Sequence, residues 1–143
     1  MSDPMRILLV EDDALILMQM EVLVEDAGHR VVGTAMRTHE AVDLARTVRP
    51  DLAFVDLRLA EGDSGIDVAR RLREEHGVMV VFVTANPLKL GNDFAGAAGV
   101  IAKPFTRSVM ARAMPYLEQC VRCPPPCLAL PLGMHMASEY QRQ

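Results

Sequence analysis

Strand-sized apolar runs alternate along this chain with longer segments of helical period, and this alternation constrains the possible fold more than any other feature. The runs expected to form strands are 6–10, 31–36, 52–55, 79–83 and 100–102. Parallel strands need crossover connections, and the intervening segments are long enough to supply them as helices. We therefore predict an α/β fold of one domain with a doubly wound, five-stranded parallel sheet.

Helices are expected after the first, second, third and fifth strands. The first covers about 14–27, stops at Gly28, and places Leu15, Met18 and Val22 on one face. The later helices are expected to begin at the side-chain caps Thr38, Ser64 and Thr106.

Two regions depart from the alternation. Prolines and glycines interrupt the segment between Thr84 and Lys103, so the fourth helix should be short, near 93–98, or missing. Pro115 should kink or end the last helix. The domain is expected to span 1–121, because 122–143 shows no period. That tail is too short for an effector domain and is expected to form an ordered strap, a partner-binding arm or a disordered segment.

All three cysteines lie in the segment CVRCPPPC, at Cys120, Cys123 and Cys127. A disulfide framework is therefore not what holds the domain together. His135 could complete a zinc site with them, but such a site normally has two well-spaced ligand pairs. Incidental thiols on a proline-rich tail are the preferred interpretation.

Charge and hydropathy exclude two classes of partner. The net charge of −4 argues against nucleic acid, because binding phosphates calls for a basic surface. The longest apolar runs are strand-sized, and the N-terminus has no signal-peptide pattern, so membrane insertion is not expected. The protein is expected to be soluble and cytoplasmic.

Polar side chains follow four of the expected strands. Ligands of open parallel sheets bind beyond the carboxyl ends of the strands, where these residues should meet. Clustered carboxylates repel one another unless they take up a proton or a hard cation such as Mg²⁺. With the cation bound, one carboxylate could attack phosphorus while a hydroxyl and an ammonium contact phosphoryl oxygens. The residues concerned are Glu11, Asp12, Asp56, Thr84 and Lys103, whereas Asp13 is assigned to the first turn or N-cap of the first helix.

The motifs LLVEDD, FVDL, VTAN and AKPF, in this order and spacing, resemble the receiver domain of two-component response regulators over about 5–121. That family has a flavodoxin-like (βα)5 fold. The resemblance implies that Asp56 is the phosphoacceptor, Thr84 the switch hydroxyl and Lys103 the phosphate contact. It also implies that a sensor histidine kinase or a histidine phosphotransfer protein donates the phosphoryl group.

A magnesium site follows from the same resemblance. Asp12, Asp56 and the main-chain carbonyl of Arg58 would hold Mg²⁺, with Glu11 reaching it through water. The side chains of Arg58 and Asn86 would flank the phosphoryl group and tune its lifetime. The alternative for these two residues is that they are solvated surface residues.

The chain departs from the usual family pattern at several positions. Ala60 replaces a common proline, the loop around it is one residue longer, and Val100 replaces the aromatic switch residue of the fifth strand. The segment after Thr84 is also short. These departures predict an unusual output surface and unusual dimerisation, although a homodimer stays open.

The leading hypothesis is a single-domain response regulator that signals through an unknown downstream protein or acts as a phosphate sink. It would be no enzyme beyond self-catalysed phosphotransfer and autodephosphorylation. The alternative is a degenerate receiver that binds partners without phosphorylation. A phosphatase of the haloacid-dehalogenase type wants an acid where Arg58 stands, and a nucleotide binder wants a glycine-rich loop where VEDDAL stands.

Overall fold

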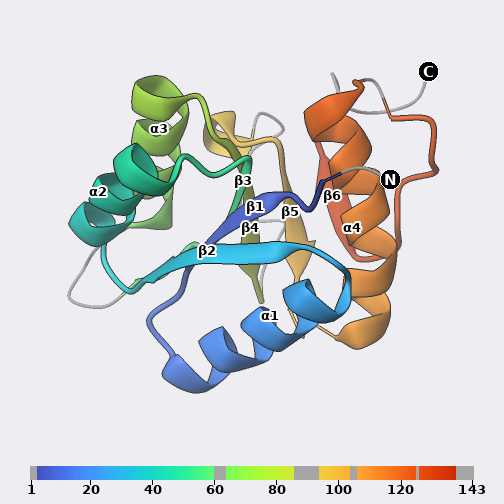
Figure 1. The fold of residues 1–143 in the computed structure, drawn as a ribbon, viewed down its shortest axis with the longest axis horizontal. Coiled ribbons are helices and arrows are strands. Elements are labelled where there is room, and N and C mark those ends of the chain that lie inside the picture. Colours follow the sequence, from blue (N-terminus) through green and yellow to red (C-terminus); the bar gives the residue numbers. More distant parts are fainter. Residues whose placement is uncertain (1–2, 60–63, 86–93, 104–105, 125, 138–143) are drawn as a thin grey trace.

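A six-stranded sheet forms the centre of the computed structural model, which describes residues 3–59, 64–85, 94–103, 106–124 and 126–137 (Figure 1). The strand order is β2-β1-β3-β4-β5-β6, and the first five strands are parallel. Their bounds are β1 Arg6–Val10, β2 Arg30–Ala35, β3 Leu52–Asp56, β4 Met79–Thr84, β5 Gly99–Ala102 and β6 Met134–Met136. The predicted doubly wound α/β fold is confirmed.

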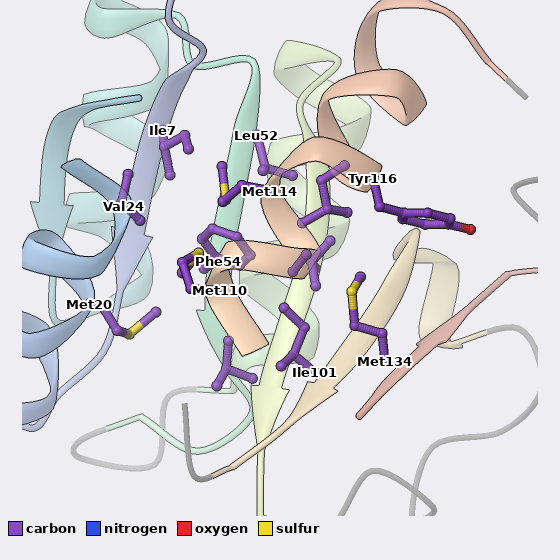
Figure 2. Close-up of a cluster of buried hydrophobic side chains, with 14 of the residues drawn as sticks. Ile7, Met20, Val24, Leu52, Phe54, Ile101, Met110, Met114, Tyr116 and Met134 are labelled. Atoms are coloured by element: carbon purple, nitrogen blue, oxygen red, sulfur yellow. The ribbon is translucent and has the colours of Figure 1, made fainter. Parts of the chain in front are cut away.

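Two helices cover each face of the sheet (Figure 1). The helices are α1 Ala14–Asp26, α2 Thr38–Val48, α3 Gly65–His76 and α4 Arg107–Arg122. Helices α1 and α4 pack on one face, and Figure 2 shows methionines of both helices around Phe54 of β3. The unbranched, polarizable side chain of methionine suits such irregular gaps. Helices α2 and α3 pack on the opposite face.

The face of α1 that contacts the sheet is not the one that carries Leu15, Met18 and Val22. Leu15, Met18 and Val22 are 65%, 63% and 54% exposed, whereas the buried residues of α1 are Leu17, Met20 and Val24. Because α1 is apolar on both sides, helical period alone does not select the inner face. The result is an apolar stripe on the solvent side of α1.

Three of the four predicted N-terminal caps are confirmed. The side chains of Asp13, Ser64 and Thr106 accept backbone N–H groups from the first turns of α1, α3 and α4. Thr38 is instead the buried first residue of α2, and Arg37 holds the cap position without a side-chain cap bond. Burial of its side chain in the fold, rather than cap chemistry, accounts for the threonine at that position.

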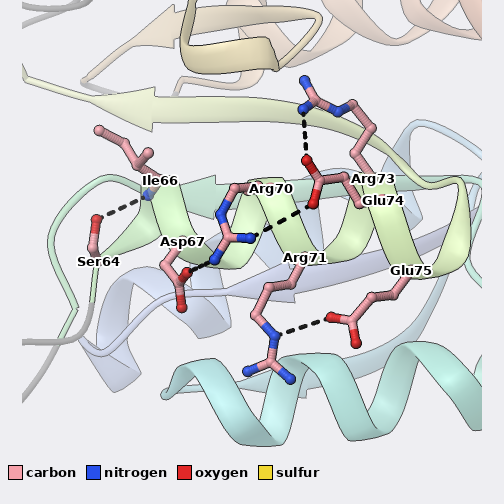
Figure 3. A network of polar contacts seen from close by, with 8 residues as sticks. All are labelled: Ser64, Ile66, Asp67, Arg70, Arg71, Arg73, Glu74 and Glu75. Atoms are coloured by element: carbon pink, nitrogen blue, oxygen red, sulfur yellow. Dashed lines mark hydrogen bonds and ion pairs between the residues drawn. The ribbon is translucent and has the colours of Figure 1, made fainter.

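The solvent face of α3 carries pairs of opposite charge at helical spacing (Figure 3). Arg70 pairs with Asp67 and Glu74, and Arg71 pairs with Glu75. Exposed pairs of this kind contribute about 0.3–0.5 kcal/mol each. This face is therefore a solvated surface rather than a site.

The connection between β4 and β5 contains a single turn of 3-10 helix, η3 Phe94–Gly96, among its described residues. Arg73 of α3 donates a hydrogen bond to the Gly96 carbonyl and holds this turn against the sheet. The described part agrees with a shortened fourth helix, and 86–93 lie outside the described residues. At the other expected irregularity, α4 does not end at Pro115, which is exposed, but continues to Arg122. Water can reach the carbonyl one turn earlier that the proline leaves without a donor.

The C-terminal segment adds a strand to the five that were predicted. β6 pairs antiparallel with β5, with Gly99 opposite Met136 and Ile101 opposite Met134. A side chain at Gly99 would overlap the His135 carbonyl oxygen, so glycine is needed for this close approach. Of the three possibilities left open for the tail, the described residues 123–124 and 126–137 agree with an ordered strap.

The cysteines do not gather into a metal site. Burial raises the pKa of the Cys120 thiol to about 11, so it stays protonated, while Cys123 and Cys127 are exposed. Within the described ranges, the group of three or more potential ligands is made of carboxylates, not of these thiols and His135. In the same part of the chain, no helix combines the length and apolarity that crossing a bilayer requires.

Candidate functional site

The sheet delivers the predicted site residues to one edge. Glu11 follows β1, Asp56 ends β3, Thr84 ends β4 and Lys103 follows β5. Parallel register aligns these ends, because Asp56 lies opposite Val83, one residue before Thr84. Each residue is therefore placed by the end of a buried strand rather than by a loop.

Three carboxylates meet at this edge. Oxygen atoms of Glu11, Asp12 and Asp56 lie within 4.8 Å of one another. Glu11 is 1% exposed and Asp56 is 9% exposed. Carboxylates this close and this buried repel one another unless a positive charge or a proton intervenes.

Lys103 supplies a positive charge to the cluster. Its Nζ lies 3.3 Å from Asp56 Oδ2 and 3.6 Å from Glu11 Oε2. Its backbone N–H donates to the Thr84 carbonyl at 2.8 Å, which ties the ends of β4 and β5 together. One ammonium faces three carboxylates, so the cluster keeps an excess of negative charge when all are ionised.

Glu11 shows the effect of this excess. Burial raises its pKa to about 7, repulsion from Asp56 adds to the rise, and attraction to Lys103 opposes it. One carboxylate oxygen accepts the Asp13 N–H at 3.3 Å, whereas Oε2 is buried without a hydrogen-bond partner. A proton on this oxygen, or a water bound to a cation, would satisfy a buried carboxylate oxygen that has no hydrogen-bond partner.

The donor set suits magnesium. Hard divalent cations prefer oxygen ligands, and Mg²⁺ is usually bound by one or two carboxylates together with waters. The carboxylate oxygens of Asp12 and Asp56 and the unpartnered Glu11 oxygen provide such a set. The residues present therefore fit the cation predicted from the sequence.

The backbone after β3 fixes the orientation of Asp56. The Arg58 N–H donates to Asp56 Oδ1 at 3.2 Å, and Arg58 forms an antiparallel bridge with Ser64. The Gly65 N–H donates to the Leu57 carbonyl at 3.0 Å. The Arg58 side chain itself is exposed.

Gly65 is a site residue that the sequence analysis missed. A Cβ at this position would overlap the Asp56 carbonyl oxygen, so the start of α3 can approach the acceptor strand only as glycine. A glycine at the first position of an otherwise regular helix, next to a candidate acceptor, was the available signal.

Of three remaining predicted positions, the structure describes two. Val100 is fully buried and lies opposite Phe82 of β4 and His135 of β6, so its place in β5 is flanked on both sides. Thr84 is 8% exposed. Asn86 lies outside the described residues, so its flanking position stays a prediction.

Comparison with known proteins agrees with this geometry. The family model described as the response regulator receiver domain matches residues 7–114. The phyllosphere-induced regulator PhyR of Methylorubrum extorquens is 44% identical over 123 residues, which cover 82% of this chain and 46% of that protein. The crystal structure of the response regulator PhyR from Brucella abortus is similar with a TM-score of 0.68 and 33% identity, covering 82% of this chain and 48% of that chain.

A second similar structure is a complex. It contains the anti-anti-sigma factor PhyR with the anti-sigma factor NepR from Bartonella quintana; it matches with a TM-score of 0.53 and 35% identity. The match covers 55% of this chain and 33% of that chain. The chain spans about half the length of the curated relatives it matches, between 46% and 55% of the first ones.

Proposed function

Because this chain belongs to the response regulator receiver domain family, we propose that Asp56 accepts a phosphoryl group from a phosphohistidine and that the product signals by protein contact. The observation that carries the proposal is the position of Asp56. Its carboxylate ends a buried strand, touches Lys103, and lies within a cluster of carboxylates that fits a divalent cation. The donor would be a sensor histidine kinase or a histidine phosphotransfer protein.

The reaction is a transfer between two side chains. An oxygen of Asp56 attacks phosphorus, the bond from phosphorus to the donor imidazole breaks, and the imidazole nitrogen keeps the electron pair and takes up a proton. The Lys103 ammonium, 3.3 Å from Asp56, then stabilises the added negative charge. Thr84 would donate its hydroxyl to a phosphoryl oxygen.

Magnesium would support this reaction from the acid cluster. Asp12, Asp56 and the Arg58 carbonyl would hold it, with Glu11 acting through a water. When bound, Mg²⁺ offsets the negative charge of the cluster and of the incoming phosphoryl group.

The exposed stripe on α1 supports a docking surface for the phosphodonor. Leu15, Met18 and Val22 line a groove of about 470 Å³ together with Arg107 at the start of α4. Helix α1 begins directly after Asp13, so this groove adjoins the acceptor site. A donor must bring its histidine to Asp56, and an apolar helical face next to the site gives it a place to bind.

The output is proposed to be a contact with another protein. The related PhyR of Bartonella quintana was crystallised with an anti-sigma factor, which supports a protein partner for this chain as well. The net charge of −4 disfavours nucleic acid as the partner. The second candidate function is a phosphate sink, which requires no output partner. In both functions the protein would act in the cytoplasm and receive its phosphoryl group from a kinase there. In either case the role is signalling rather than turnover of a substrate.

The test is phosphorylation of the whole protein. With Mg²⁺ and a small-molecule phosphodonor, intact mass should increase by one phosphoryl group, and chelation of the metal or Asp56→Asn should prevent it. Amide NMR with beryllofluoride, which mimics a phosphoryl group on aspartate, should shift signals at Asp56, Thr84 and Lys103. A folded protein that gains no phosphoryl group and shows no shifts would be a degenerate receiver, and the proposal would be wrong.

A further inference from the structure

The outer, lateral edge of β5 is covered by β6, and of the strands in the sheet β6 is the one held least firmly. β6 has three residues, and its connection to α4 leaves Leu128, Leu130 and Leu132 exposed. In the described part of that connection, the Gln119 side chain anchors the strap by accepting the backbone N–H groups of residues 127 and 128. The strap is thus held by few contacts compared with the central strands.

The burial pattern of β6 indicates which kind of peptide segment the outer edge of β5 can bind. Met134 and Met136 are 3% and 1% exposed and join the core beneath α4, while His135 between them is exposed. Figure 2 shows Met134 beside Ile101 of β5. The edge therefore binds an extended segment with apolar side chains at alternate positions and a polar one between them.

A direct connection joins this edge to the acceptor site. The N–H of Ala102 donates outward to the Gly133 carbonyl of the strap at 2.9 Å. The N–H of the next residue, Lys103, donates inward to the Thr84 carbonyl at 2.8 Å. A movement of the Thr84 or Lys103 backbone that accompanies phosphorylation would therefore be transmitted to Ala102 and its bond to the strap.

We propose that the outer edge of β5 is a binding site for an extended apolar segment of a partner protein, and that β6 occupies this edge until phosphorylation of Asp56 releases it. The release step rests on the proposed function. The strap then acts as an internal substitute for the partner, and the exposed edge is the output surface. A partner segment would add to the sheet by main-chain hydrogen bonds, with two apolar side chains filling the places of the methionines.

Hydrogen exchange of the full chain tests the release. The amides of Ala102 and Ala137 bond across the β5–β6 boundary, to Gly133 and Ala98. With Mg²⁺ and beryllofluoride their exchange should speed up about tenfold or more, while amides of β1 and β3 keep their rates. Shifts at Thr84 and Lys103 without faster exchange at these two amides would overturn the inference alone. Absence of shifts at Thr84 and Lys103 would overturn the proposed function and the release step.

A peptide tests the edge itself. The probe is the chain's own segment PLGMHMA, residues 131–137, and its control carries serine at both methionine positions. In the full-length variant Met134→Ser/Met136→Ser, the chain's own strap should fill the edge poorly. Without beryllofluoride, this variant should bind the probe peptide at least tenfold more tightly than it binds the control peptide. The full-length variant His135→Ser is the matched control and should stay closed. Equal binding of the two peptides, or none to the folded double variant, would overturn the proposal.

A glycine variant separates the edge from other surfaces. Gly99→Ala places a methyl group against any strand on this edge, whereas Gly33→Ala in β2 meets leucine side chains at 3.4 Å or more. With beryllofluoride bound, the chain carrying Gly33→Ala should bind the probe and the one carrying Gly99→Ala should not. Binding that survives Gly99→Ala would locate the site elsewhere and contradict the proposal.

Discussion

The acceptor site and the strap both touch β5, but different kinds of interaction organise them. Every charged residue of the site follows a buried strand, so the parallel sheet places it whatever the neighbouring side chains are. The strap is placed by long-range contacts, which include main-chain pairing with β5, two buried methionines, the close approach at Gly99 and the Gln119 side chain. The comparison teaches that the strand ends fix the geometry of the site, whereas the position of the strap is coupled to the site, so that a change at either should shift the other.

The largest expected effect is at the acceptor. Asp56→Asn should abolish phosphorylation, because an amide is not a nucleophile toward phosphorus, while β6 stays paired with β5. Intact-mass measurement after treatment with a small-molecule phosphodonor checks the first part, and exchange of the Ala137 amide checks the second. Loss of β6 protection in this variant would show that the strap depends on the charge of the site, and the distinction between the two regions would fail.

A matched pair of glycine substitutions comes next. Gly65→Ala forces a methyl group against the Asp56 carbonyl in the sheet interior and should lower the free energy of unfolding by about 3 kcal/mol. Gly77→Ala, at a helix end with open space but positive φ, should cost about 1 kcal/mol. Urea unfolding measures both. Equal values would mean that the approach of α3 to the acceptor strand is not tightly packed.

The edge should yield a smaller global change. Met136→Ala removes a side chain buried beneath α4 and should lower the free energy of unfolding by about 2 kcal/mol or less, because an edge strand can detach locally. His135→Ala, an exposed neighbour, should be nearly neutral. Chemical unfolding gives the values, and a cost for Met136→Ala well above that range would make β6 an integral part of the core rather than a releasable strap.

The acid cluster predicts a pH dependence in metal-free protein. The pKa of Glu11 is raised from 4.5 to about 7 in the fold, so between these values the folded state binds more protons than the unfolded state. Stability should therefore fall by on the order of 2 kcal/mol as pH rises from about 5 to about 8. Glu11→Gln should remove most of this slope, and Mg²⁺ should stabilise more at pH 8 than at pH 5. A slope that Glu11→Gln leaves intact would assign the dependence to other groups.

The smallest effect on stability is expected on the outer face of α1. Met18→Glu should change the free energy of unfolding by no more than about 0.5 kcal/mol, because the side chain is 63% exposed. It should slow phosphoryl transfer from a protein donor by about tenfold while leaving the rate with a small-molecule donor unchanged. The matched control is Gln19→Glu, in the same groove, because it adds the same charge without removing an apolar side chain. A slower reaction with both kinds of donor would place the defect in the acceptor site instead.

Much of the fold and of the site could be predicted, for one reason. Strands buried on both faces are nearly continuous apolar runs, and the residue that ends each run is polar, so Asp56, Thr84 and Lys103 stand out in the sequence. Asp13, Ser64 and Thr106 were also predictable, because capping depends on one side chain and the backbone beside it.

The features that were undecided or wrongly predicted share the opposite property. The inner face of α1 depends on how a helix that is apolar on both sides rotates against the sheet, and Leu17 and Met20 prevail over Leu15 and Met18 only through packing. The hydroxyl of Thr38 could cap a helix, but in the fold Thr38 is the buried first residue of α2. Of the two outcomes expected at Pro115, a kink or an end of the helix, the structure contradicts the end, since α4 is held on both sides of Pro115 by buried residues such as Met114 and Tyr116.

The sequence by itself determined the alternation of strands and helices, and with it the edge at which acids, hydroxyl and ammonium meet. These are consequences of local period and of residues next to strand ends. Only the tertiary structure decided that the C-terminal segment returns to β5 as a sixth strand, and that Gly65 and Gly99 allow close backbone approach. Such features depend on contacts between residues far apart in the chain, which local patterns do not record.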